Sequence, residues 1–87
     1  MADLKMKIVH RGMIEMRETR LPLGGVEIAF LLPGGRRAAL INKPPEGDRN
    51  WYVFTHDRRR FHSRRSAVAE ACAYAERLAR TEDAARQ

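Results

Sequence analysis

The chain has 87 residues, a formal net charge of +6 and 44% hydrophobic side chains. This length fits one domain and this hydrophobic content supports a thin core, which excludes a two-domain protein and a disordered chain. Cys72 is the single cysteine, so an intramolecular disulfide framework is excluded. No apolar run approaches the roughly 18–20 residues that span a bilayer, and the first residues do not read as a signal peptide. We therefore expect a cytoplasmic protein without a membrane partner.

Positive charge is concentrated in the middle of the sequence. Residues 36–65 contain nine basic and three acidic side chains, whereas residues 1–35 and 66–87 are almost neutral. A local excess of charge indicates an anionic partner more strongly than a diffuse one does. Arginine outnumbers lysine by fourteen to three, a bias typical of GC-rich bacterial genomes and of their phages and plasmids.

The first 25 residues predict an N-terminal hairpin or arm. Apolar side chains alternate with lysines over residues 4–9, which is typical of a strand. Gly12 permits a turn because glycine adopts positive φ without steric cost. Residues 13–17 then form either a returning strand or part of a short helix over residues 13–20. A segment with one proline and two glycines ends this part of the chain.

Residues 26–62 predict a small antiparallel sheet with three core strands. The clearest strand covers residues 26–32, where alternate positions are strongly apolar. Strands over residues 37–42 and 50–56 follow, separated by turns rich in glycine and proline. Residues 61–62 add a short strand after a turn that contains three arginines.

Residues 63–82 predict an amphipathic helix, followed by a loose tail over residues 83–87. Ser63 has the chemistry of a helix N-cap. Small and apolar residues repeat at helical spacing and form one buried face, made of Val68, Ala71, Cys72, Ala75, Leu78 and Ala79. The fold class is therefore α+β, with one C-terminal helix across one face of the sheet.

The third core strand carries aromatic side chains on both of its faces. Trp51 and Val53 lie on one face, and Tyr52 and Phe54 lie on the other. One helix covers only one face of a sheet, so the second face needs another cover. We expect the N-terminal segment to supply it, and a second copy of the chain, as a homodimer, is the alternative.

No catalytic motif is present in the sequence. The phosphate-binding, nucleophile-elbow and dinucleotide glycine patterns are all missing. Three histidines and Cys72 are the potential metal ligands, but a lone cysteine on the apolar face of a helix is typical of a buried small side chain. We expect neither enzymatic activity nor a metal or other cofactor.

Arginine clusters are the most informative feature of the sequence. Two clusters flank strands, and the third falls in the first turn of the helix, where the helix dipole disfavours positive charge. With free amides and serine hydroxyls nearby, arginines at a helix start could bind phosphate. Tyr52 is the aromatic that we expect to be exposed and able to stack on bases. The candidate nucleic-acid-binding residues are Arg36, Arg37, Arg58, Arg59, Arg60, Arg64, Arg65 and Tyr52.

Residues 50–78 read NWYVFTHDRRRFHSRRSAVAEACAYAERL. This succession of a Trp-containing strand, a turn, a Phe, a Ser cap and an Ala-rich helix resembles the three-stranded-sheet-plus-helix domains at the N-termini of tyrosine recombinases, and small bacterial domains of the same layout. In the arm-binding domains of those recombinases the sheet enters the DNA major groove. The resemblance implies that Arg36, Arg37, Arg58 and Arg60 face DNA.

Two functions are consistent with these features. The first is a DNA- or RNA-binding accessory protein of a bacterium or a mobile element, in which arginines contact phosphates. The second is a small interaction module or inhibitor that binds an acidic protein surface, with the same arginines steering association.

Overall fold

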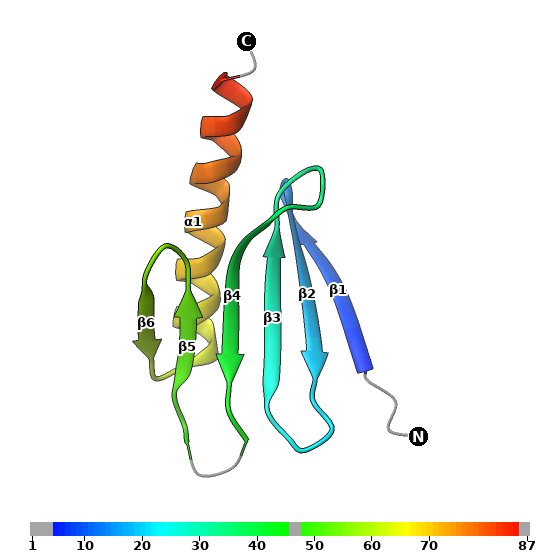
Figure 1. Cartoon of the computed structure of the whole chain (residues 1–87), viewed down its shortest axis with the longest axis vertical. Helices are drawn as coiled ribbons and strands as arrows, with labels where there is room; N and C mark the ends of the chain where they lie inside the picture. Colours follow the sequence, from blue (N-terminus) through cyan, green and yellow to red (C-terminus); the bar gives the residue numbers. More distant parts are fainter. Residues whose placement is uncertain (1–4, 46–47, 86–87) are drawn as a thin grey trace.

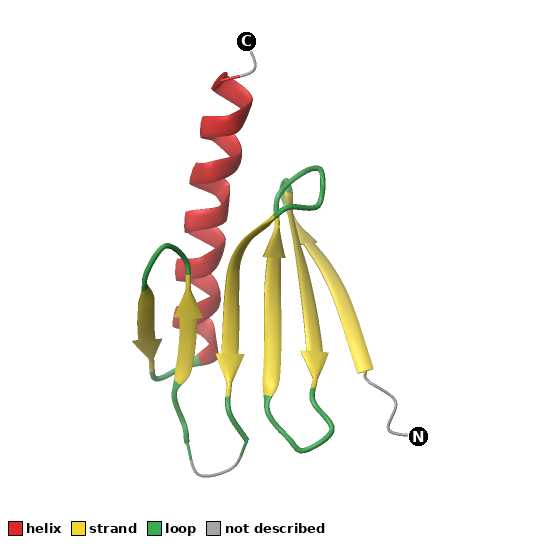
Figure 2. Cartoon of the chain, in the orientation of Figure 1, coloured by secondary structure: helices red, strands yellow, loops and turns green. Residues whose placement is uncertain are grey.

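The fold is a six-stranded antiparallel sheet with one helix packed on one of its faces (Figures 1 and 2). The computed structural model describes residues 5–45 and 48–85. Each strand pairs with the next one in the sequence. The elements are β1 (Lys5–Arg11), β2 (Ile14–Arg20), β3 (Val26–Leu31), β4 (Arg37–Lys43), β5 (Trp51–Phe54), β6 (Arg58–Phe61) and α1 (Arg64–Ala85). The α+β class is thus confirmed. The sheet has six strands, because the N-terminal hairpin and β6 extend the three predicted core strands.

The N-terminal segment extends the sheet instead of covering its second face. Its two strands form the predicted hairpin rather than the alternative helix, and Gly12 turns the chain with a φ of 58°. β2 also pairs with β3, where Met16 lies opposite Phe30. The expectation that this segment covers the second face is therefore wrong, because β2 contributes its apolar side chains to the same core as β3. Leu4, the expected start of the first strand, lies outside the described residues.

The core lies between the sheet and α1. Ile28 and Phe30 of β3 are fully buried there, as their alternation along the strand predicts. Ala67, Ala71 and Ala75 of α1 are also fully buried, at intervals of four residues. Such small side chains let the helix axis approach the sheet closely, although each contributes less hydrophobic free energy than a leucine would. The packed cluster comprises Ile14, Met16, Ile28, Phe30, Leu32, Ala39, Ile41, Val53, Ala67, Val68, Ala71, Cys72, Ala75 and Ala79.

Helix α1 begins where the sequence predicts and ends later than expected. The Ser63 hydroxyl accepts a hydrogen bond from the backbone N–H of Ser66 at 3.1 Å, which confirms Ser63 as the N-cap. The helix continues through residues 83–85, so the predicted loose tail begins too early. None of the described helices has both the length and the apolar character needed to cross a bilayer.

The two faces of the sheet therefore differ, and we call them the helix face and the open face. The helix face carries the core side chains of β2 to β5 together with Arg59 and Phe61 of β6. The open face carries the alternate residues of each strand, and no described element packs on it (Figure 1). On its β4–β6 half it presents Leu40, Asn42, Tyr52, Phe54, Arg58 and Arg60.

Candidate nucleic-acid interface

The three consecutive arginines at residues 58–60 lie in a strand and not in a turn. They form most of β6, and the actual turn covers residues 55–57. Side chains alternate along a strand, so Arg58 and Arg60 lie on the open face and Arg59 lies on the helix face. The prediction that these three arginines form one cluster in a turn is therefore wrong, because β6 presents them on both faces of the sheet.

Arg58 is the centre of the group on the open face. Arg58 lies opposite Phe54 of β5, and Arg60 lies opposite Tyr52 of the same strand. The Arg58 guanidinium carbon is 4.5 Å from the centroid of the Tyr52 ring and 5.7 Å from that of Phe54. Both distances are in the range of cation–π attraction. The arginine and the two aromatic rings thus form one continuous basic and aromatic surface.

Arg37 joins this surface through an irregularity in the sheet. The register between β3 and β4 shifts after Phe30, so that Arg37 and not Ala38 lies opposite Leu31. A shallow hollow of about 340 Å³ connects Arg37 with Phe54 across β4 and β5. A second hollow of about 350 Å³ is lined by Tyr52 and the three arginines of β6. The β3–β4 and β5–β6 turns also lie at the same end of the sheet (Figure 1), a relation that the sequence leaves open.

The seven predicted arginines divide according to their partners. Three of them form ion pairs: Arg36 with Glu82, Arg59 with Glu70 and Arg64 with Glu18. Within residues 5–45 and 48–85, the other four have no carboxylate within ion-pair distance: Arg37, Arg58, Arg60 and Arg65. A guanidinium without an internal carboxylate keeps its full charge available to an anionic ligand. Arg37, Arg58 and Arg60 also share the open face, whereas Arg65 lies on α1 at the other side of the sheet.

The helix start offers fewer free groups than the sequence suggests. The hydroxyls of Ser63 and Ser66 bond to each other at 3.0 Å, and Ser63 also caps the helix. Arg64 pairs with Glu18 on β2 and lies 5.9 Å from the Trp51 ring centroid. The predicted phosphate site at this position therefore retains only Arg65 without a described carboxylate partner.

Tyr52 is half-buried, contrary to the expectation that it is the exposed aromatic. Its hydroxyl donates to the Asp48 carboxylate at 2.8 Å, and the backbone N–H of Asn50 donates to the same group at 2.9 Å. The Asn50 N–H, together with Tyr52, holds the pKa of Asp48 below its ordinary value. The ionised Asp48 thereby fixes the Tyr52 ring. Phe54, which is 37% exposed, is the more accessible of these two aromatics. Its position two residues after Tyr52, on the same face of the strand, is the sequence signal that indicates it.

Comparison of the chain with protein-family models, with curated proteins and with solved structures gave no match.

Proposed function

We propose that this protein binds nucleic acid through the open face of β4, β5 and β6. The observation that carries the proposal is the grouping of Arg37, Arg58 and Arg60 beside Phe54 and Tyr52, without a described carboxylate partner for any of the three arginines. Arginines of this kind bind phosphates, and accessible aromatic rings stack on bases. The protein is then a binding accessory and not an enzyme.

The geometry favours contacts to the backbone of the nucleic acid over the reading of base sequence. The guanidinium groups line hollows on a sheet face that no described helix or strand covers. Phosphate contacts position a protein on its nucleic acid and carry no sequence information themselves. We therefore expect affinity with strong salt dependence and weak sequence preference.

The test compares two triple variants that remove the same charge from different places. One is R37A/R58A/R60A, on the open face; the matched control is R36A/R59A/R64A, which removes the three arginines with carboxylate partners. Binding of fluorescein-labelled single-stranded DNA, duplex DNA and RNA is measured by anisotropy over a range of salt. The open-face variant should flatten the slope of log K against log salt by about 2–3, since each lost phosphate contact removes about 0.7–0.9.

The control triple variant should change the slope much less, provided that circular dichroism shows both variants to be folded. Equal losses in the two variants would mean that diffuse charge and not the open face binds the nucleic acid. A wild-type protein that binds none of the three probes at low salt would overturn the function itself.

A further inference from the structure

The outer edge of β1 is open. β1 is the first strand of the sheet and pairs with β2 alone. Every second residue of an edge strand directs its N–H and C=O away from its one neighbour, which makes the edge a template for another strand. β1 has seven residues, whereas β6 at the opposite edge has four. Along β1 the large apolar side chains are unusually accessible: Met6 is 58% exposed, Ile8 51% and Val9 39%.

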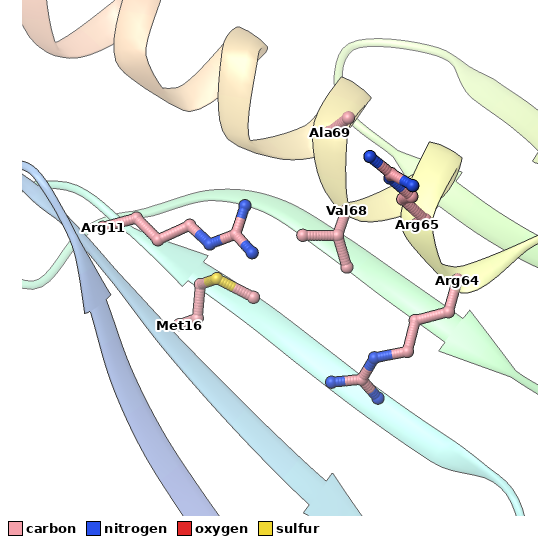
Figure 3. Close-up of a pocket in the computed structure, with 6 residues that line it drawn as sticks. All are labelled: Arg11, Met16, Arg64, Arg65, Val68 and Ala69. Carbon is pink, nitrogen blue, oxygen red and sulfur yellow. The ribbon is translucent and has the colours of Figure 1, made fainter.

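A basic groove runs beside this edge on the helix face. α1 packs on β2 to β6 and does not reach the described residues of β1. The space that it leaves is a hollow of about 620 Å³, and Figure 3 shows the Arg11 side chain extending into it toward Val68, above Met16. Arg64 and Arg65 approach from the first turn of α1. The groove therefore combines an apolar floor with guanidinium groups from two elements.

The positive charges that line the groove favour a negatively charged ligand. Neither Arg11 nor Arg65 has a described carboxylate within ion-pair distance, and Lys7 lies on the same face of β1 as Arg11. β1 itself contains no acidic residue. Antiparallel pairing of two copies of β1 would thus set positive charges against one another, which destabilises a strand pair. A second copy of the chain is accordingly a poor occupant, and an acidic segment is a good one.

We propose that β1 binds an extended acidic segment of a partner protein by strand addition. The segment pairs its main chain with the free edge of β1. Its acidic side chains, at alternate positions, enter the groove and meet Arg11 and Arg65. Its apolar side chains, on the other face of the added strand, lie against Met6 and Ile8. This site does not depend on nucleic-acid binding, because β1 and β6 are opposite edges of the sheet.

The probe for this site is a fluorescein-labelled synthetic peptide of alternating glutamate and valine, titrated with the full chain. Two further peptides test the recognition mode: one replaces glutamate by glutamine, and one places proline at alternate positions to remove N–H donors. The glutamate peptide should bind, the glutamine peptide should bind at least about tenfold more weakly because it lacks charge-assisted hydrogen bonds, and the proline peptide should not bind. Equal binding of the proline peptide would overturn strand addition.

The protein variants are R11E/R65E and the matched control R77E/R80E, which makes the same charge change farther along the exposed side of α1. R11E/R65E should lose at least about tenfold in affinity for the glutamate peptide, and the control should keep most of it. Amide NMR spectra verify folding and should shift at β1 and the first turns of α1. Equal losses in both variants, shifts confined to β6, displacement of the peptide by an oligonucleotide or concentration-dependent dimerisation through β1 would each overturn the proposal.

Discussion

Glycines with positive φ occupy three turns of this sheet, and the surroundings of these glycines differ. Gly25 has a φ of 89°, and a Cβ atom at this position would lie 2.8 Å from the Lys43 carbonyl oxygen. Gly34 has a φ of 99°, and a Cβ atom there would meet no atom within 4 Å. The backbone conformation alone disfavours an L side chain at both positions. Only at Gly25 does a clash with backbone add to this cost.

The two glycines predict unequal losses of stability. Gly34→Ala should lower the free energy of unfolding by about 1–2 kcal/mol, the cost of a left-handed conformation for alanine. Gly25→Ala should lower it by roughly 3 kcal/mol or more, because the main chain of residues 43–45 must also move. Urea denaturation of both variants measures the difference. Equal losses would show that this loop yields without cost.

Cys72 links stability to alkaline pH. Burial raises the pKa of the Cys72 thiol above its ordinary value of 9.0, and the Glu76 carboxylate, 3.6 Å from the sulfur, adds to this effect. The unfolded chain therefore loses this proton at lower pH than the folded chain does. The contribution to stability is fully present below about pH 9 and is lost as the pH rises through the pKa of the folded state.

A comparison of the wild type with Cys72→Ala isolates this contribution. The difference in unfolding free energy between the two proteins should be constant below about pH 9 and should decrease above it. Denaturant titrations at a series of pH values measure this difference. Both proteins contain the same lysines and tyrosines, so the contributions of these residues cancel when the two free energies are subtracted. A pH-independent difference would mean that the thiol ionises equally in both states.

Among the elements, α1 depends on its alanines for its position over the sheet. Ala75 is fully buried, and Ala73 on the same helix is exposed. Ala75→Leu should lower the unfolding free energy by about 1–3 kcal/mol, because three additional carbon atoms push the helix away from the sheet. Ala73→Leu should change it by less than about 0.5 kcal/mol, since leucine forms helices nearly as well as alanine. A similar effect of both substitutions in thermal denaturation would contradict close packing at Ala75.

Patterns among neighbouring residues were sufficient to predict β3, the start of α1 and the buried face of α1. The alternation from Val26 to Leu32, the Ser63 cap and the alanine stripe each depend on neighbouring residues, and the structure confirms all three. The sequence of residues 58–60 indicates a turn instead of a strand, because three consecutive arginines show no alternation of polar and apolar side chains. Only pairing with β5 makes them a strand.

The position of the N-terminal hairpin could not be predicted for a related reason. An apolar face on β2 is equally compatible with stacking on the sheet and with extending it. The pairing of Met16 with Phe30 shows that β2 extends the sheet. The sequence of neither strand alone reveals this pairing. Which arginines form ion pairs could not be predicted for the same reason. Glu18, Glu70 and Glu82 lie beside their arginine partners only when the sheet and the helix are assembled.

At the scale of the whole molecule, the two proposed surfaces are distant from each other. At about 4.8 Å between neighbouring strands, β1 lies about 24 Å from β6 and about 14 Å from β4, the strand that carries Arg37. The groove beside β1 is also on the helix face, whereas Arg58 and Arg60 are on the open face. At physiological salt the Debye length is about 8 Å. Repulsion between anionic ligands at the two surfaces is then largely screened.

The protein should therefore bind an oligonucleotide and the glutamate–valine peptide at the same time. Saturation with unlabelled oligonucleotide should change the peptide affinity by less than about threefold at physiological salt, and somewhat more at low salt, where the Debye length increases. Peptide anisotropy with and without oligonucleotide measures the coupling, and sedimentation identifies the ternary complex. R37A/R58A/R60A should lose the oligonucleotide but keep the peptide, and R11E/R65E should do the reverse. Mutual exclusion at physiological salt would mean that both ligands use one surface, because repulsion across the sheet over more than a Debye length is largely screened.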